Sequence, residues 1–355
     1  MENNTDSKIK IGITHGDING ISYEIILKSF EDERITDFFT PVIYGSPKVA
    51  AYYKKMLQFN TNFNSITKIE QASNTQINII NCATNNIKVE LGKSTKMAGQ
   101  SSLNALRHSI IDIKNNKLDI LVTAPINKNN IQTEDFNFAG HTRFFASEFG
   151  GNEVVMLMVH ENLRIGVATE HIAISEIPSN LTIELILDKL RVIAKSLKSD
   201  FAINKPVIAV LGLNPHSGDN GLIGKEEQEI IIPAIQKAKE EGIIAVGPYP
   251  ADGFFGSSEY KKFDAVLAMY HDQGMIPFKT LAQNQGVNFT AGLPFVRTSP
   301  AHGTAYNIVG KNKSNHESFM QAMYLALDIY KNRKMIDTVE MNLDSKQEDK
   351  KQEKK

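Results

Sequence analysis

The sequence predicts an α/β fold, because short apolar runs alternate with longer stretches of helical periodicity along most of its 355 residues. The runs end at Gly, Pro, Asn or His, as strands do when they enter turns. Stretch 102–115 carries Leu103, Leu106, Ile110 and Ile113 at intervals of three to four residues, which places them on one helix face. With 41% apolar and 22% charged residues, the composition is that of a globular protein.

The apolar runs predict the individual strands, and the stretches with three-to-four-residue apolar spacing predict the helices. The expected helices are 102–115, 226–241 and 317–331. The expected strands, in chain order, are 9–14, 41–44, 77–80, 120–123, 154–159, 165–169, 207–213 and 265–270.

The chain length predicts two or three domains, since domains usually hold roughly 100–200 residues. We expect the chain to pass from one domain to the other in the loop-rich segment 127–140 and in the Gly/Pro-rich segment 274–300. We therefore expect a first α/β domain formed by 1–135 and 276–340 and a second formed by 136–275. The charged segment 341–355 is expected to be a disordered tail, because it has almost nothing apolar to bury.

Charge and cysteine content exclude several classes of protein. The net charge of -1 gives no electrostatic basis for a nucleic-acid or anionic-membrane partner. The single cysteine, Cys82, excludes an intrachain disulfide and cysteine-based zinc sites. No apolar run approaches the ~20 residues needed to span a bilayer, and the polar N-terminus does not look like a signal peptide. We expect a cytoplasmic protein.

Three histidines lie at the carboxyl ends of expected strands, where α/β proteins bind ligands. His171, His216 and His271 each follow the carboxyl end of an expected strand. Three neutral imidazoles with an open fourth position would form a catalytic metal site, although they are also compatible with ordinary loop histidines, and His15 has a similar position. Asp272 directly follows His271 and is either a carboxylate that orients this histidine or a helix N-cap.

Polar residues suited to an anion form a second group. Lys279, Asn288 and Arg297 lie in a segment interrupted by Gly and Pro, and Arg297 is one of few arginines. A guanidinium binds carboxylate or phosphate through two parallel hydrogen bonds. His141 and Thr142 follow a glycine and offer further donors. A surface arginine and a helix N-cap at Thr142 are the alternatives.

Glycine-rich segments do not match the common nucleotide-binding motifs. The chain has no G-x-G-x-x-G, so a conventional Rossmann fingerprint is absent, and Ile87 stands where a P-loop before Gly92 requires glycine. The loop GLNPHSGDNGLIGKEE precedes an expected helix. It is either an anion-binding loop or a tight connection between strand and helix.

Taken in order, the motifs resemble the 4-hydroxythreonine-4-phosphate dehydrogenase family of the pyridoxine pathway. The resemblance extends from about residue 9 to 331 through ITHGDINGISYEI, AGHTRF, VATEH, GLNPHSGDNGLIGKEEQEIIIPAI, GPYPAD, DAVLAMYHDQGMIPFKTL and GVNFTAGLPFVRTSPAHGTA. It implies a fold similar to isocitrate and isopropylmalate dehydrogenases, with two α/β domains around a cleft. It also implies a homodimer that shares its metal site between subunits.

The same resemblance assigns roles to residues. It implies a divalent metal (Zn, Mg or Co) on His171, His216 and His271. Lys279 and Asp272 are the catalytic candidates, with NAD or NADP as cofactor at residues that the resemblance leaves unknown. The implied substrate contacts are His141, Thr142, Lys279, Asn288 and Arg297.

The implied reaction is oxidation of 4-phosphooxy-L-threonine at C3 followed by decarboxylation to 3-amino-2-oxopropyl phosphate. Relatives that act on 4-phospho-threonate or 4-phospho-erythronate share most of these motifs, so this substrate is an alternative. A metal-dependent phosphoryl or acyl transferase or hydrolase, and a non-catalytic phospholigand-binding module, are alternatives from other classes. His15 and Glu170 depart from the residues usual in the family's motifs.

Overall fold

The computed structural model describes residues 8–83, 86–133, 138, 140–150 and 153–352. The chain divides into two compact units, one formed by Met1–Asn152 and Leu281–Ala326 and the other by Glu153–Thr280 and Leu327–Lys355. The unit boundaries thus lie at 152/153, 280/281 and 326/327. The sequence suggested 135/136, 275/276 and 340/341. The domain boundaries themselves stay a prediction.

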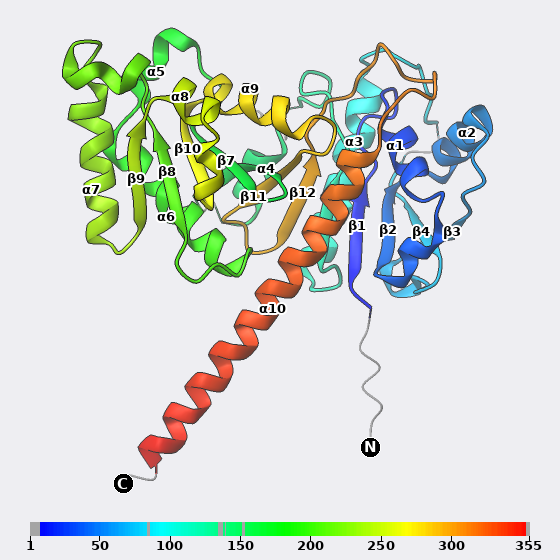
Figure 1. Cartoon of the computed structure of the whole chain (residues 1–355). Helices are drawn as coiled ribbons and strands as arrows, with labels where there is room; N and C mark the ends of the chain where they lie inside the picture. The colour runs from blue at the N-terminus through cyan, green and yellow to red at the C-terminus, as the bar shows by residue number, and fades with distance from the viewer. Residues whose placement is uncertain (1–7, 84–85, 134–137, 139, 151–152, 353–355) are drawn as a thin grey trace. The chain divides into compact units, whose positions relative to one another are not determined.

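The first unit contains a largely parallel sheet with the strand order β3-β4-β2-β1-β5-β12-β11. Each neighbouring pair is parallel except β11 and β12, which are antiparallel. Figure 1 shows β1, β2, β4 and β3 in this arrangement. The strands are β1 (Lys10–Thr14), β2 (Thr40–Gly45), β3 (Phe63–Ile66), β4 (Ile77–Asn81), β5 (Ile120–Thr123), β11 (Val287–Ala291) and β12 (Val296–Pro300).

Helix α3 (Lys96–Lys114) packs against β1 and β2 and carries the predicted apolar stripe. Leu103, Leu106, Ile110 and Ile113 are all buried, which confirms the periodicity argument. The helix begins where the hydroxyl of Thr95 accepts a hydrogen bond from the amide of Ala98. The other helices of this unit are α1 (Ser22–Ser29), α2 (Pro47–Leu57) and α4 (His141–Glu148).

The strands of the second unit are ordered β6-β7-β10-β8-β9. Strands β6 and β7 form an antiparallel pair, and the remaining pairs are parallel. The carboxyl ends of β7, β8 and β10 therefore lie along the same edge. The strands are β6 (Val155–His160), β7 (Leu163–Thr169), β8 (Val207–Leu211), β9 (Ile244–Tyr249) and β10 (Ala265–Tyr270).

Helix α6 (Ile183–Ser199) covers the strands of the second unit through contacts with β6, β7 and β10, and α7 (Ile232–Glu240) packs against α6 and β9. A short π-helical segment (Glu227–Ile231) leads into α7. Helix α9 (His271–Ala282) starts directly at the end of β10. The remaining helices are α5 (Ile177–Asn180) and α8 (Ala251–Gly256).

The predicted α/β fold is confirmed, and every predicted strand is present with its ends shifted by at most two residues. Sequence patterns missed β3, β9, β11 and β12. Strand β9 is largely exposed, and its short apolar run 243–246 is interrupted by Gly247 and Pro248, which are typical of turns. Strand β12 is buried, yet most of its residues are polar or proline, which resembles a loop.

Helix α10 (Glu317–Gln352) continues through 341–352, where the composition predicts a disordered tail. The difference has a physical reason, since this segment lacks glycine and proline and is rich in the good helix formers Lys, Glu and Gln. Residues 353–355 lie outside the described part. Among the described residues, no helix is both long and apolar enough to cross a membrane.

Candidate active site

The first group of predicted site residues is organised around Arg297 in β12. This side chain is only 1% exposed. Its guanidinium donates hydrogen bonds to the hydroxyl of Thr290 at 3.1 Å, to that of Thr123 at 2.5 Å and to Nδ1 of His141 at 3.0 Å. Thr123 ends β5, Thr290 lies in β11 and His141 begins α4, so three neighbouring elements hold the guanidinium. None of these three partners carries a negative charge.

The contact with Arg297 determines the tautomer of His141. A guanidinium only donates hydrogen bonds, so Nδ1 must accept and the ring proton lies on Nε2. Burial, reinforced by the charges of Arg297 and Lys128, holds the pKa of His141 well below its usual value. His141 is therefore a neutral donor through Nε2–H.

Two buried donors in this cluster have no protein partner among the described residues, namely Nε of Arg297 and Nε2 of His141. Burial also lowers the pKa of Arg297 to about 9, because the cation has been removed from water. Buried unsatisfied donors beside an uncompensated cation have the chemistry of an anion-binding site.

Thr142 and Asn288 lie next to this cluster in the chain. Thr142 is the second residue of α4 and is half-buried. Asn288 lies in β11, two residues before Thr290, and its buried Oδ1 has no hydrogen-bond partner in the described part of the chain. The structure shows no direct bond from either side chain to Arg297.

In the second unit, His171 and His271 lie close together. His171 follows β7 and His271 follows β10, two adjacent strands, and their ring centroids are 5.9 Å apart. Nδ1 of His271 is 2.7 Å from a carboxylate oxygen of Asp272, so the carboxylate orients the ring and leaves Nε2 for another ligand. The carboxylate oxygen Oε2 of Glu170 lies 3.7 Å from Nδ1 of His171.

His216 lies in an unusual turn after β8. Residues 216–220 all have positive φ, between 42° and 79°, which forms a left-handed turn within the segment Pro215–Gly221. The buried carboxylate of Glu227 accepts hydrogen bonds from the amides of Leu213 and Asn214 at 2.8 and 2.7 Å. Its other oxygen accepts from Nδ2 of Asn214 at 2.9 Å. Glu227 therefore holds the start of the turn that carries His216.

The same contacts decide between the two interpretations of this glycine-containing loop. Amides that would meet a phosphate are already bound to Glu227, and an added Cβ at Gly218 would come within 2.6 Å of its carboxylate. A second negative group there would be repelled. These contacts favour a tight connection over the anion-binding interpretation at the start of this loop.

The described residues of one chain contain no group of three or more His, Cys, Asp or Glu side chains that could hold a metal. His171 and His271 are neighbours, whereas His216, which is exposed, does not complete a group with them. The donor types suit a divalent metal such as zinc.

Lys279 lies in α9 of the second unit, eight residues after His271, and its side chain is exposed. A helix separates two such positions by roughly 12 Å along its axis. Asp272, the other catalytic candidate, is also exposed.

Sequence reasoning missed the residues that position the site. Thr123 and Thr290 hold Arg297, but both lie within buried strands and have no motif of their own. Gln273 connects β10 to the His216 loop by donating to the carbonyl of Gly212 at 2.6 Å. For Glu227 there was a signal, since an acidic residue after a glycine-rich loop is a possible cap for its amides.

The model of the family described as pyridoxal phosphate biosynthetic protein PdxA matches residues 37–326. The chain belongs to the PdxA family. A relative from Bacteroides thetaiotaomicron named 4-hydroxythreonine-4-phosphate dehydrogenase is 51% identical, over 92% of this chain and 90% of that protein. The resemblance of the motifs to this family is confirmed.

Another relative and a solved structure are also similar to this chain. A protein from Oceanobacillus iheyensis named putative D-threonate 4-phosphate dehydrogenase is 36% identical, over 90% of this chain and 97% of that protein. The crystal structure of 4-hydroxythreonine-4-phosphate dehydrogenase from Klebsiella pneumoniae is similar with a TM-score of 0.80 at 31% identity, and the match covers 91% of this chain and 100% of that chain.

Proposed function

We propose that this chain is a 4-hydroxythreonine-4-phosphate dehydrogenase. It oxidises the C3 hydroxyl of 4-phosphooxy-L-threonine to a ketone, transferring hydride to NAD or NADP and releasing a proton. The ketone is then beta to the carboxylate, so the acid loses carbon dioxide and takes up a proton, which yields 3-amino-2-oxopropyl phosphate. Membership of the PdxA family and the named dehydrogenases within it support this activity.

The observation that carries the proposal is the buried cluster around Arg297. Its guanidinium has three neutral partners, while Nε of Arg297 and Nε2 of His141 are left without one. The proposed substrate carries a phosphate and a carboxylate, and either anion would accept from both donors. Thr142 and Asn288 extend the set of polar groups beside the cluster.

Because His141 is a neutral donor, it binds an anion without a change in protonation. Neutrality also suppresses repulsion between this ring and the guanidinium of Arg297. We assign Lys279 to holding an anion of the substrate or to moving a proton, and its exposed position in α9 leaves its ammonium accessible.

The metal assignment uses His171, His216 and His271 from two copies of the chain. Asp272 orients the ring of His271, and Glu227 holds the loop that carries His216. A divalent metal such as Zn, Mg or Co, when bound, supplies Lewis-acid polarisation of the substrate's oxygen. The three histidines form no three-donor group within the described part of one chain. A homodimer whose subunits share the site would bring them onto one metal ion.

A nicotinamide cofactor, when bound, supplies the hydride acceptor. A second substrate candidate is D-threonate 4-phosphate or the erythronate isomer, which the Oceanobacillus relative's name favours. These sugar-acid phosphates carry a hydroxyl where 4-phosphooxy-L-threonine carries its amino group. None of the residues proposed to contact the substrate is assigned to this amino group.

The test is the absorbance of reduced nicotinamide with purified protein and each phosphorylated substrate, with and without a chelator. Reduction with 4-phosphooxy-L-threonine and release of carbon dioxide is the expected result. Faster turnover of the threonate or erythronate phosphate would assign the alternative substrate. If no substrate reduces the cofactor with metal supplied, the proposed function is wrong.

A further inference from the structure

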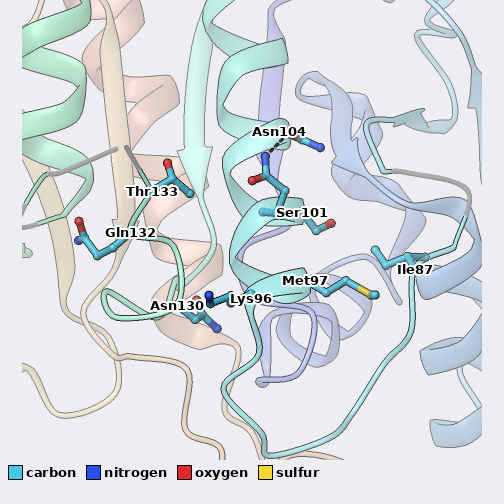
Figure 2. A pocket seen from close by; sticks show the side chains of 9 residues that line it. Ile87, Lys96, Met97, Ser101, Asn104, Asn130, Gln132 and Thr133 are labelled. Atoms are coloured by element: carbon cyan, nitrogen blue, oxygen red, sulfur yellow. Dashed lines mark hydrogen bonds between the residues drawn. The ribbon is translucent and has the colours of Figure 1, made fainter. Parts of the chain in front are cut away.

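The first unit contains a cavity of about 510 Å³ that none of the assigned residues lines. Figure 2 shows side chains that reach it from the first turns of α3, from the loop after β5 and from Ile87. Such a volume lies within the range of roughly 300–1,000 Å³ typical of small-molecule sites. The cavity is lined by Ile87, Lys96, Met97, Gln100, Ser101, Asn104, Asn130, Gln132 and Thr133.

The loop that closes one side of the cavity is held against α3. A Cβ at Gly99 would lie only 1.9 Å from the carbonyl oxygen of Asn130, so only glycine allows the loop to come this close. The amide of Asn130 donates to the carboxylate of Asp17 at 2.8 Å. The hydroxyl of Tyr306 donates to the same carboxylate at 2.7 Å and accepts from Nδ2 of Asn127 at 3.0 Å. The cavity wall is thus fixed by side chains rather than by the contents of the cavity.

Two polar atoms of the wall are buried and have no partner among the described residues, Oδ1 of Asn130 and Oγ1 of Thr133. The bond to Asp17 fixes the orientation of the Asn130 amide, so its Oδ1 is an acceptor that needs a donor. Buried unsatisfied groups are rare and call for a ligand or water.

The chemistry of the lining suits a nucleotide. Among the described lining residues the only charge is the ammonium of Lys96, which stands at the first position of α3, where helix N-terminal amides add positive potential. Three of the four carboxamides in the lining already donate within the protein, from Gln100 to Asn104, from Gln132 to two backbone carbonyls and from Asn130 to Asp17. The buried Oδ1 of Asn130 is therefore the acceptor that a base or a nicotinamide amide would meet. Met97 and Ile87 offer apolar contact to a flat ring.

We propose that this cavity binds one nucleotide half of the nicotinamide dinucleotide, with its phosphate at Lys96 and its ring between Met97 and Ile87. This inference rests on the proposed dehydrogenase function, and it assigns the cofactor residues that the motifs leave open. The phosphorylated acid substrate fits less well, because it carries two anionic groups and no ring, whereas the cavity has one cation and an apolar wall.

The experiment measures binding of NADH and NADPH through the change in nicotinamide fluorescence, using the full chain. The protein has no tryptophan, so its own emission does not interfere. Lys96→Ala should weaken dinucleotide binding by roughly 10- to 150-fold, as expected for loss of a charge-assisted contact. Lys93→Ala is the matched control, since Lys93 is an exposed lysine that does not line the cavity.

A second variant fills the cavity. Asn104→Phe should abolish dinucleotide binding, while Asn115→Phe, at the exposed carboxyl end of the same helix, should leave it unchanged. AMP and nicotinamide mononucleotide, tested as competitors, distinguish the halves. The nucleotide that loses affinity for Asn104→Phe is the one bound in the cavity.

The possible outcomes distinguish a failure of the cavity assignment from a failure of the proposed dehydrogenase function. Wild-type binding that persists in Lys96→Ala and Asn104→Phe would overturn the cavity assignment and leave the dehydrogenase proposal intact. Loss of substrate binding with unchanged dinucleotide binding would also overturn it. A wild-type protein that binds neither dinucleotide would reject both the assignment and the proposed function.

Discussion

The guanidinium of Arg297 donates to Nδ1 of His141 at 3.0 Å, and this contact makes the imidazole a donor through its other nitrogen. Among the described residues, two donors of this pair stay without partners in a buried setting.

Replacing Arg297 by Ala should weaken binding of the phosphorylated substrate by about 10- to 150-fold, because a charge-assisted hydrogen bond contributes roughly 1.5–3 kcal/mol. Isothermal titration and the KM of the substrate measure this effect. Arg143→Ala is the control, since Arg143 is an exposed arginine two residues after His141. Unchanged constants in Arg297→Ala would place this residue outside the site.

His15 should make the protein less stable in acid. The ring is buried, donates through Nε2 to the carbonyl of Ser101 at 3.1 Å, and has a pKa lowered to about 4 by burial. Between pH 6.5 and 4 the unfolded state takes up a proton that the folded state does not, so the free energy of unfolding falls as the pH falls.

Between pH 7.5 and 5, His15→Gln should therefore lose about 2 kcal/mol less free energy of unfolding than the wild type. Urea titrations at the two pH values measure the difference. The exposed His108, changed to Gln, provides the control. Equal losses in wild type and His15→Gln would show that His15 does not titrate in this way.

Glu227 should control metal binding from a distance. Gln at this position would place an amide donor against the Nδ2 group of Asn214 or against the amides of Leu213 and Asn214, and would release the left-handed turn. Loss of a group that orients a ligand typically weakens metal affinity about 10- to 100-fold. Equilibrium dialysis with zinc measures this, and Glu229→Gln, an exposed neighbour, should retain full affinity.

A shared metal site predicts complementation. His216→Ala and His271→Ala should each be inactive, but mixing them under conditions that exchange subunits should restore part of the activity. In the mixed dimer one site inherits both changes and the other inherits neither. A site built within one chain would give no recovery, because each site would then carry one change.

The sequence was sufficient for the fold class and for most strands, because buried strands and amphipathic helices have regular apolar periods. It failed at β12, where Arg297, Thr298 and Ser299 are polar but buried through hydrogen bonding within the sheet region. Tertiary contacts, not composition, make this segment a strand.

Candidate site residues were found by motif, whereas their geometry needed the structure. Nothing in the order of the chain places Thr123 beside Arg297, since they are 174 residues apart. The position of His216 could not be predicted either, because consecutive positive φ values in residues other than glycine are disfavoured locally and depend on Glu227.

The left-handed turn at 216–220 also limits how this chain can evolve. An L-residue in this conformation costs roughly 1–2 kcal/mol, with Asn and Asp among the best tolerated and β-branched residues among the worst. Asp219 and Asn220 are of the tolerated kind. The left-handed backbone thus limits positions 216–220 to a narrow set of amino acids. A lineage that lost catalysis but kept this loop conformation would therefore still keep residues of this kind there.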